Sequence, residues 1–362
     1  MSVALLPCPV TEPHHYEPAA ADAPTVTDFF CGAGGSSEGL RQAGFRLRIA
    51  CNHDPVSKLT HQWNHPGVEH RLANLAETDF TQLPSTSVLW ASPSCVWHSR
   101  AGGRKRPSAA DRVQELRRDD AGSLDRATAF AVIAAAEVHL YPVIIIENVV
   151  EFCDWILFDW WLDGLLALGY TAQLGIYDAA DFGHAQNRRR WIGVFTQPGI
   201  HIDLTPQTLA PVYAAAILDP DPGELVTRPM YITPQIQQIT EPGVVHLATY
   251  RNHARALRAD THRLPTVTAG GNHHARVVLD EDGRAWQRLL RHRECARAQG
   301  FPDTYRFATL RDARRELGPD VQSIGSTRDV VKRQIGNAVP VGLARWLGTR
   351  AAAGLAASAA AA

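Results

Sequence analysis

The chain has 362 residues, of which 45% are hydrophobic and 20% charged, and its formal net charge at pH 7 is −1. This length and apolar content predict a globular protein of about two domains with a substantial core. A net charge near zero argues neither for nor against binding of nucleic acid, so any anion-binding surface must come from local clusters of cations. No apolar run has the length of a membrane span and the first residues lack the order of a secretion signal, so we expect neither.

The cysteines and the two ends of the chain carry little sign of chemistry. The six cysteines are dispersed, with no Cys-x-x-Cys pair and no spacing typical of a zinc site. We therefore expect a protein of the reducing cytoplasm that holds no metal. Residues 1–24 are rich in Ala, Pro and His without periodicity, and residues 351–362 are almost all Ala. The first segment is predicted to be a disordered tail and the second an Ala-rich tail.

The first ordered unit is predicted to be a strand, a glycine turn and a helix. Residues 25–30 are an apolar strand, residues 31–37 are rich in glycine, and a helical pattern continues to Gly44. Such a turn lets backbone N–H groups approach a ligand, and the start of the helix favours a negative group. Packing alone also produces such turns, and the glycine spacing departs from the dinucleotide fingerprint. The next strand ends at Asn52, where such folds place a group for ribose hydroxyls, which favours an adenosine-bearing cofactor.

A cysteine follows a second buried strand. The apolar residues 88–91 stop at the turn Ser92-Pro93-Ser94, which leads directly into Cys95. In an open α/β sheet the carboxyl ends of the strands form the rim where ligands bind, so Cys95 is a candidate nucleophile there. A buried structural cysteine is the alternative on this stretch alone. The basic run at residues 100–106 is predicted to be a loop that closes on phosphates or, alternatively, a solvated charged loop.

A carboxylate follows a third buried strand. Residues 143–146 are β-branched without alternation, which is typical of a strand buried on both faces, and they lead to Glu147 on the same rim. A carboxylate there needs either a partner or a chemical purpose. Arg188 and Arg190 precede a further strand at alternate positions, so they are predicted to point to one side, toward the site. The alternative role for either arginine is a structural salt bridge to Glu147 or to a neighbouring acid.

The order of these stretches resembles that of the DNA cytosine-5 methyltransferase family, over roughly residues 26–195 and 263–347. The stretches that carry the resemblance are Asp28-Phe29-Phe30-Cys31-Gly32-Ala33-Gly34-Gly35, Pro93-Ser94-Cys95, Glu147-Asn148-Val149, Gln186-Asn187-Arg188-Arg189-Arg190, Arg293-Glu294-Cys295-Ala296-Arg297, Gly300-Phe301-Pro302-Asp303 and Gln334-Ile335-Gly336-Asn337-Ala338-Val339-Pro340. The resemblance implies an α/β fold with a doubly wound Rossmann-like methyltransferase sheet over residues 25–197. It also implies a small target-recognition domain over residues 198–290, and a hinge and helix over residues 291–350 that return to the catalytic domain.

The resemblance further implies a DNA (cytosine-5-)-methyltransferase, which transfers a methyl group from S-adenosylmethionine to C5 of a cytosine flipped out of duplex DNA. Cys95 would add to C6, Glu147 would contact N3 and the exocyclic amine, and Arg190, supported by Arg188, would bind the base carbonyl. The expected cofactor-binding residues are Phe29, Gly32, Gly34, Gly35, Asn52, Asp54, Asn74, Pro93 and Asn337. The expected DNA-binding residues are Ser99, Arg100, Arg104, Lys105, Arg106, Arg251, Asn272 and His273. A monomer on DNA, in the cytoplasm of a prokaryotic or phage-infected cell, is expected.

The chain departs from the family's usual residues at four positions. Ser94 and Val96 flank Cys95 where Pro-Cys-Gln is usual, and Asn52 and Asn74 replace two acids that face the cofactor. An amide oxygen accepts a hydrogen bond without charge, so the usual cofactor is expected, with weaker binding. The short span of the small domain predicts a short recognition sequence, of about two to four base pairs.

Two other functions remain open on the sequence. A close relative of the family methylates cytosine in transfer RNA, and the short recognition region does not exclude an RNA substrate. The second alternative is a catalytically silent DNA-binding member of the fold, against which the retained Cys95, Glu147 and Arg190 argue. A nicotinamide oxidoreductase is disfavoured because its glycine spacing is missing.

Overall fold

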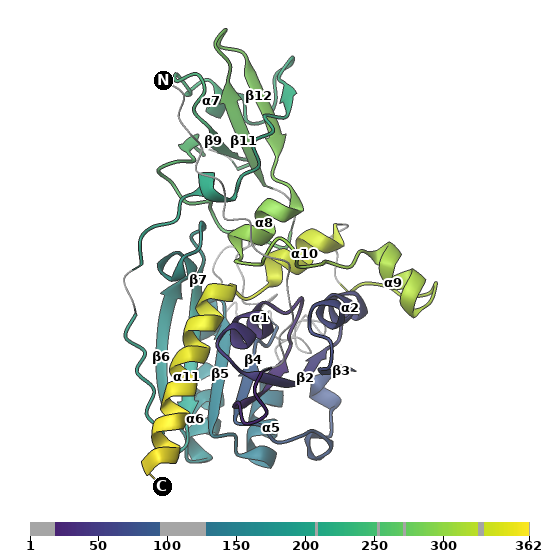
Figure 1. Cartoon of the computed structure of the whole chain (residues 1–362), viewed down its shortest axis with the longest axis vertical. Coiled ribbons are helices and arrows are strands. Elements are labelled where there is room, and N and C mark those ends of the chain that lie inside the picture. The colour runs from purple at the N-terminus through teal and green to yellow at the C-terminus, as the bar shows by residue number, and fades with distance from the viewer. Residues whose placement is uncertain are drawn as a thin grey trace.

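The computed structural model describes residues 19–94, 128–206, 209–251, 254–270, 273–324 and 329–361. Within these residues the chain forms a seven-stranded and a five-stranded sheet, which lie one above the other along the long axis in Figure 1. The strands of the larger sheet are β1 (Thr25–Phe29), β2 (Arg46–Asn52), β3 (Glu69–Leu72), β4 (Val88–Ala91), β5 (Val143–Asn148), β6 (Thr171–Asp178) and β7 (Arg189–Thr196). Their order is β3-β2-β1-β4-β5-β7-β6, and only β7 runs antiparallel to its neighbours. The predicted doubly wound α/β sheet is confirmed.

The direction of winding reverses between β1 and β4. From β1 the chain continues to β2 and β3 on one side, and it then returns to β4 and β5 on the other. Ligands of open α/β sheets bind beyond the carboxyl ends of the strands at such a reversal. Phe29 and Ala91, the last residues of β1 and β4, are paired, and the backbone N–H of Ser92 donates to the carbonyl oxygen of Phe29 at 3.1 Å. The turns after the two strands therefore lie side by side.

Helices cover both faces of the larger sheet. The helices of the described residues are α1 (Gly35–Gln42), α2 (Pro55–Asn64), α5 (Phe130–His139), α6 (Phe158–Ala167), α7 (Thr233–Ile236), α8 (His292–Ala298), α9 (Leu310–Leu317), α10 (Val330–Asn337) and α11 (Val341–Ala361). α5 and α6 share a core with Leu89 and Ile144, whereas α1 and α11 share a core with Trp90 and Ile145. Neighbouring residues of one strand reach opposite faces, so β4 and β5 need apolar residues without alternation.

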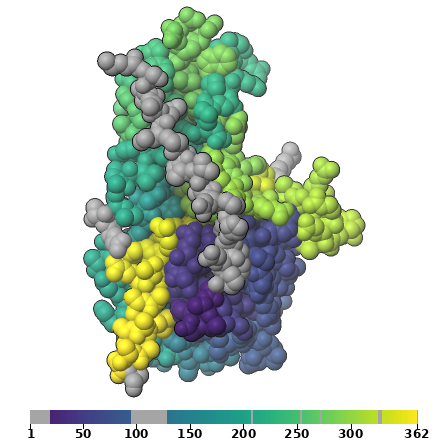
Figure 2. Space-filling view, viewed as in Figure 1, coloured from purple at the N-terminus to yellow at the C-terminus, as the bar shows by residue number. Residues whose placement is uncertain are grey.

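The end of the chain corrects one sequence expectation. The Ala-rich composition predicts a tail over residues 351–362, but residues 351–361 complete α11. Ala351 and Gly354 are buried, and a Cβ placed on Gly354 would lie 2.6 Å from the carbonyl oxygen of His201. Alanine has the highest helix propensity, so an Ala-rich segment that meets an apolar surface extends a helix. Figure 2 shows this helix in yellow, on the surface beside the N-terminal part of the larger domain.

The smaller sheet is antiparallel and lies within residues 198–290, the range expected for the small domain. Its strands are β8 (Glu224–Leu225), β9 (His246–Thr249), β10 (Leu257–Arg258), β11 (His274–Leu279) and β12 (Ala285–Leu289), in the order β10-β9-β11-β12-β8. Ala275 and Val277 of β11 pack with Ile232 beside α7 on one face. Leu247 of β9 packs with Cys295 of α8 on the other, so this face rests on the segment that joins the two sheets.

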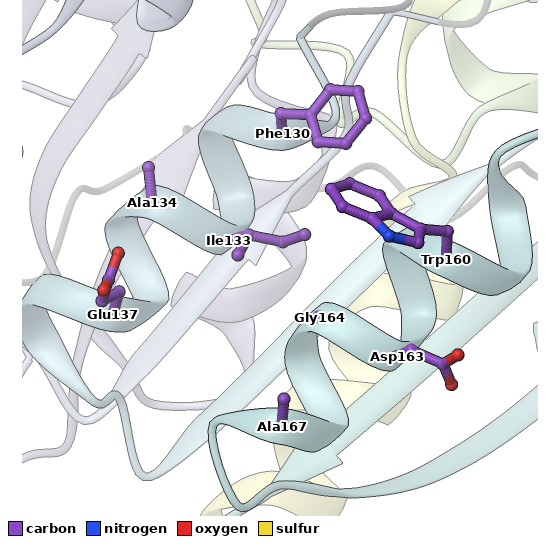
Figure 3. A pocket seen from close by; sticks show the side chains of 8 residues that line it. All are labelled: Phe130, Ile133, Ala134, Glu137, Trp160, Asp163, Gly164 and Ala167. Atoms are coloured by element: carbon purple, nitrogen blue, oxygen red, sulfur yellow. The ribbon is translucent and has the colours of Figure 1, made fainter.

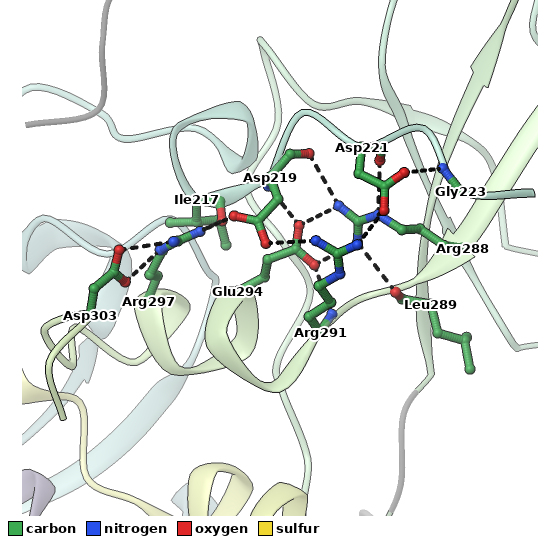
Figure 4. Close-up of polar contacts among 10 residues, drawn as sticks. All are labelled: Ile217, Asp219, Asp221, Gly223, Arg288, Leu289, Arg291, Glu294, Arg297 and Asp303. Carbon is green, nitrogen blue, oxygen red and sulfur yellow. Dashed lines mark hydrogen bonds and ion pairs between the residues drawn. The ribbon is translucent and has the colours of Figure 1, made fainter. Parts of the chain in front are cut away.

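A network of ion pairs joins the smaller sheet to α8 (Figure 4). Arg288 of β12 pairs with the fully buried Glu294 at 2.7 Å. Arg297, one turn further along α8, pairs with Asp303 and with Asp219, both at 2.7 Å. The charged residues of this late motif, Glu294 and Arg297, thus help to hold the smaller sheet on α8.

His184, which lies just after the 3-10 helix Ala179–Phe182, is buried as a neutral ring. Its Nδ1 donates to the carbonyl oxygen of Ala298 at 3.2 Å, and its Nε2 accepts from the backbone N–H of Gly342 at 2.9 Å. Burial lowers the pKa of His184 from 6.5 to about 4. Between these two values the unfolded chain binds a proton that the folded protein does not. The free energy of unfolding therefore decreases as the pH falls from the first value to the second.

We predict that His184→Gln removes one proton from this pH dependence. The free energy of unfolding, measured with denaturant at several values between about pH 4.5 and 7, should vary less steeply in the variant. The difference in slope is expected to be about 1.4 kcal/mol per pH unit. Other titrating groups are common to both proteins and cancel in the comparison. Equal slopes would contradict the neutral, buried state of His184.

Candidate active site

The turn that leads into Cys95 lies next to the end of β5. Ala91 of β4 pairs with Ile146 of β5, which places the next residues of both strands at the rim. The side-chain amide of Asn148 donates to the carbonyl oxygen of Pro93 at 3.1 Å. The backbone N–H of Ser94 donates to Oγ1 of Thr128 at 3.2 Å. Cys95 itself lies outside the described residues, but Pro93, two residues before it, is hydrogen-bonded to Asn148 on the strand that carries Glu147.

Glu147 and Arg190 form an ion pair at this rim. Nε of Arg190 lies 2.8 Å from Oε1 of Glu147, and the side chains are 12% and 9% exposed, respectively. The pair arises from the antiparallel β5 and β7, because Glu147 is paired with Ile192 and Arg190 lies two residues before it. Charge-assisted contacts of this length orient both groups. The carboxylate at the end of β5 therefore has the partner that the sequence led us to expect.

Arg188 has contacts other than those predicted. Its side chain is buried, and its guanidinium donates to three backbone carbonyl oxygens, of Val267 at 2.9 Å, Gly336 at 2.8 Å and Ala338 at 3.0 Å. These bonds join the start of β7 to the segments before β11 and after α10. Arg188 was expected to support Arg190 at the base, but its contacts hold segments of the chain together. Arg189 is exposed, as expected for a residue that faces away.

The glycine turn after β1 leaves room for a ligand on one side only. A Cβ on Gly35 would overlap the backbone carbonyl of Val339, and a Cβ on Gly34 would lie 2.5 Å from Oη of Tyr305. At Gly32, whose φ is +52°, the nearest described atom to such a Cβ is 3.9 Å away. Gly34 and Gly35 are therefore required by packing, whereas Gly32 borders open space where a ligand can approach the backbone.

Asp28 of β1 carries an unused carboxylate oxygen beneath this turn. Its Oδ2 accepts from Oγ of Ser36 and Oγ of Ser37, both at 2.6 Å, whereas its Oδ1 is buried without a hydrogen-bond partner in the part of the chain that the structure describes. Burial raises the pKa of Asp28 to about 7. A bound cation would stabilise the ionised carboxyl. The turn thus fits a ligand with a positive group, which S-adenosylmethionine has in its α-ammonium.

Phe29 does not reach the site. Its side chain is fully buried and its ring lies 5.7 Å from that of Phe80 in the core, so its assignment to the cofactor is wrong. Phe30, which the sequence analysis did not single out, follows β1 with a φ of +60° and is partly exposed. Positive φ is uncommon for a bulky residue and is found at functional sites. Phe30 is therefore the aromatic residue at this rim, and the alternation of the strand was the signal that could have identified it.

Asn52 and Asp54, two residues expected to bind the cofactor, both form hydrogen bonds within the protein. Oδ1 of Asn52 accepts from the backbone N–H of Asp54 at 2.8 Å. The carboxylate of Asp54 accepts from Oγ of Ser57 at 2.7 Å, from Oγ of Ser323 at 3.1 Å and from the backbone N–H of Ile324 at 3.2 Å. Asp54, which was expected to bind the cofactor, thus ties α2 to a distant segment.

The other two asparagines lie at the surface. Asn74 is exposed, its Oδ1 accepts from the backbone N–H of Ala76 at 3.2 Å, and its amide donates to Glu77 at 2.9 Å. It begins the 3-10 helix Leu75–Glu77. Asn337 is exposed at the end of α10.

Two of the expected DNA-binding residues are neighbours in the smaller sheet. Arg251 follows β9 and is exposed, and His273 precedes β11. The backbone N–H of Tyr250 donates to the carbonyl oxygen of His273 at 2.7 Å, which brings the two segments together. Burial, and after it the nearby Arg251, lowers the pKa of His273. The remaining expected DNA contacts lie outside the described residues: Ser99, Arg100, Arg104, Lys105, Arg106 and Asn272.

The smaller sheet also presents a residue that the sequence analysis missed. The rings of Tyr231 and Tyr250 are stacked, with centroids 6.1 Å apart and planes at 9°, and Tyr231 is 54% exposed. Stacked, exposed aromatic rings suit contacts with bases. Tyr231 lies in a Pro-rich stretch without periodicity, so no pattern in the sequence marks it.

A groove away from the rim does not suit the predicted ligands. It lies between α5 and α6 and is lined by Phe130, Ile133, Ala134, Glu137, Trp160, Asp163, Gly164 and Ala167 (Figure 3). Its two charged residues, Glu137 and Asp163, are both acids, which disfavours a phosphate or carboxylate. Among the described residues we find no cluster of His, Cys, Asp and Glu suited to a metal ion, and no helix with the length and hydropathy to cross a membrane.

The sequence of this chain is similar to those of known proteins. The family described as C-5 cytosine-specific DNA methylase matches residues 25–263 and 230–352. The type II methylase M.HgiDII of Herpetosiphon aurantiacus is 24% identical over 355 residues, which span 88% of this chain and 92% of that protein. The type II methyltransferase M.AgeI of Thalassovita gelatinovora is 30% identical over 175 residues, which span 45% of this chain and 37% of that protein.

Solved structures extend the comparison to the fold. A putative DNA modification methyltransferase encoded within a prophage of E. coli aligns with a TM-score of 0.62 at 16% identity, over 92% of this chain and 100% of that one. The methyltransferase EhMeth of Entamoeba histolytica aligns with a TM-score of 0.65 at 14% identity, over 92% of this chain and 99% of that one. The larger sheet is thus that of the Rossmann-like methyltransferases. The chain belongs to the C-5 cytosine-specific DNA methylase family, and its class is that of the DNA cytosine-5 methyltransferases.

Proposed function

We propose that this protein transfers a methyl group from S-adenosylmethionine to C5 of a cytosine that is flipped out of duplex DNA, through a covalent adduct between Cys95 and C6. The observation that carries the proposal is the pair of Glu147 and Arg190 at the rim of the sheet, beside the Pro93-Ser94 turn that leads into Cys95. A carboxyl group that is held by an arginine beside the turn leading into a cysteine suits attack on a ring that must gain a proton as it gains electrons.

The proposed reaction assigns one task to each residue. The thiolate of Cys95 forms a bond to C6, and Glu147 delivers a proton to N3, so that C5 becomes nucleophilic. Arg190 holds Glu147 in place and donates to the carbonyl of the base. S-adenosylmethionine, when bound, supplies the methyl group as an electrophile on its sulfonium sulfur. Water then takes the proton from C5, N3 returns its proton to Glu147, and expulsion of the thiolate restores the C5=C6 double bond.

The residues that would hold S-adenosylmethionine surround the turn after β1. The open side of Gly32 receives the amino-acid part, and Oδ1 of Asp28 accepts from its ammonium. Phe30 and Asn52 border the adenosine. The amide of Asn52 contributes no charge, so we expect the ribose to be bound more weakly than by an acid.

DNA is proposed to lie across the rim and the smaller sheet. Arg251 and His273 are the described candidates for contacts with the target sequence, together with Tyr231 and Tyr250. Side chains of this number reach a short site, of about two to four base pairs. Flipping of the cytosine is required because C5 and C6 are stacked inside the duplex.

The decisive experiment is transfer of labelled methyl from S-adenosylmethionine to mixed-sequence duplex DNA, followed by sequencing of the modified positions. We predict label on cytosine C5 in one short context, and complete loss of transfer in Cys95→Ala. The matched control is Cys153→Ala, because Cys153 is exposed and lies in the 3-10 helix after β5. It should retain full activity.

Each other result would redirect the proposal. Methyl transfer to transfer RNA but not to DNA would replace the substrate. Binding of DNA without transfer to either nucleic acid would support a silent member of the fold. Transfer that persists in Cys95→Ala would contradict the covalent mechanism.

A further inference from the structure

A buried chain of hydrogen bonds runs from Asp28 to the outside of the protein. Oγ of Ser37 donates to Oδ2 of Asp28 at 2.6 Å and lies 2.9 Å from Nε2 of His61, on α2. Nδ1 of His61 lies 2.7 Å from Nε2 of His70, on β3. Asp28, Ser37 and His61 are at most 1% exposed, and His70 is partly exposed. The roles predicted for the site residues do not call for such a chain of hydrogen bonds.

Oδ2 of Asp28 accepts from both serines, and this fixes the direction of every hydrogen bond in the chain. Ser37 donates its only proton to Asp28, so its oxygen must accept from His61, which therefore carries a proton on Nε2. Burial, and after it the neighbouring His65 and His70, lowers the pKa of His61 well below its usual range, so the ring is neutral. A neutral ring protonated on Nε2 accepts at Nδ1, and His70 must donate there.

The same arrangement leaves one oxygen of Asp28 for a ligand. Oδ2 already accepts from Ser36 and Ser37, so a further donor must bind Oδ1, which lacks a partner among the described residues. His61 also contacts the turn directly, because a Cβ on Gly34 would lie 3.0 Å from its Cδ2. The imidazole of His61 therefore orients the Ser37 hydroxyl, which in turn orients Asp28. The same ring packs behind the glycine turn.

We propose that His61 is a positioning residue for the cofactor: through Ser37 it orients Asp28 so that Oδ1 accepts from the α-ammonium of S-adenosylmethionine. The inference rests on the proposed function and deepens it. His61 does not touch the cofactor. It acts by holding the Ser37 hydroxyl in the orientation in which it donates to Asp28. Without His61 this hydroxyl would rotate among several orientations.

The test compares two ligands that differ only in the ammonium group. These are S-adenosylhomocysteine and its des-amino analogue, and calorimetry gives the affinity of the full-length protein for each. We expect His61→Phe to weaken binding of S-adenosylhomocysteine by about tenfold, which is the effect of one hydrogen bond to a charged group. Binding of the des-amino analogue should stay unchanged. His61→Gln should restore the affinity, because its amide donates to Ser37 and accepts from His70.

The matched control is Thr60→Val, in the next position of the same helix. Thr60 is equally buried, and its hydroxyl donates to Oε1 of Gln334 at 2.5 Å and accepts from the backbone N–H of Ala308 at 2.8 Å. The control therefore loses buried hydrogen bonds of the same kind without touching Ser37. It should bind both ligands as the unchanged protein does. Ser37→Ala, which deletes one oxygen, should reproduce the selective loss even if His61→Phe fails to fold.

The possible outcomes separate this inference from the proposed function. If the unchanged protein binds neither ligand, both are overturned. If it binds the two ligands equally well, or if His61→Phe and Ser37→Ala weaken both ligands by the same factor, the positioning role is overturned and the proposed function stands. Selective loss in both variants, with rescue by His61→Gln, supports the inference.

Discussion

Glu147→Gln is expected to lower kcat for methyl transfer by about 10²- to 10⁴-fold, the usual contribution of a positioned acid–base group. Glutamine has the shape of glutamate, so it retains the place at the end of β5. It cannot deliver a proton to N3 of the base, and it removes the charge that pairs with Arg190 at 2.8 Å. Because the substitution leaves the rim in place, the dissociation constant for DNA should change little.

The measurement is single-turnover transfer of labelled methyl at saturating DNA and S-adenosylmethionine. Glu137→Gln serves as the control, because Glu137 is an exposed acid in the groove between α5 and α6. It should retain the full rate. A Glu147→Gln protein as active as the control would contradict the acid–base role, whereas loss of DNA binding with an unchanged rate would indicate a role in recognition alone.

Arg188→Met is expected to reduce the free energy of unfolding by about 3–5 kcal/mol. The substitution leaves three carbonyl oxygens without their donor, those of Val267, Gly336 and Ala338. Each hydrogen bond to a charged group contributes about 1.5–3 kcal/mol, and losses within one site are less than additive. Methionine fills the volume of the buried side chain, so the cost measures the lost hydrogen bonds rather than a cavity.

Unfolding by denaturant gives this free energy, with Arg189→Met as the control. Arg189 is exposed on the same strand, and its substitution should change the free energy by no more than about 0.5 kcal/mol. The pair of variants also distinguishes two roles for Arg188. An Arg188→Met protein that is as stable as the control but inactive would contradict the structural role and support the catalytic role that the motif of Arg188 suggested.

Asn52, one of the departures from the family's usual residues, has a role in the local structure. Asn52 lacks the charge of an acid, but its oxygen is already used by the backbone of Asp54 at 2.8 Å, which fixes the turn after β2. Oδ1 of Asp28, by contrast, has no hydrogen-bond partner among the described residues. We therefore expect the binding energy in this chain to be shifted from the ribose toward the amino-acid part of the cofactor. Loss of affinity should be larger for a ligand without its ammonium than for one without a ribose hydroxyl.

The rim of the site was predictable from local patterns in the sequence. An apolar run without alternation identifies a strand buried on both faces, and the first polar residue after it marks the carboxyl end. That rule placed Glu147 and the turn before Cys95 at the same edge, and the structure joins the two through Asn148 and Pro93. Strand period also predicted that Arg188 and Arg190 point toward the site, where Arg190 pairs with Glu147. These inferences depend only on neighbours in the chain and on the parallel order of strands.

Other features were decided by segments that are far apart in the sequence. The partners of Arg188 are backbone carbonyls 79 to 150 residues away, and backbone atoms leave no signature in a sequence. Asp54 meets Ser323 across 269 residues, which no local pattern reveals. From its sequence alone, the Ala-rich end is predicted to be a tail. Only the tertiary structure shows the surface on which it forms a helix, because a helix of low polarity is stabilised mainly by what it packs against.

The sequence by itself determined the family and the order of the strands along the chain, and it led to the proposed reacting groups, because these depend on motifs and on local periodicity. Only the tertiary structure decided which polar atoms remain free for a ligand. Hydrogen bonds within the protein use up most of the acceptors in the site, and their partners are set by how distant segments pack. Within the described part of the chain, Oδ1 of Asp28 has no hydrogen-bond partner, because Ser36 and Ser37 both bind Oδ2, with His61 behind Ser37.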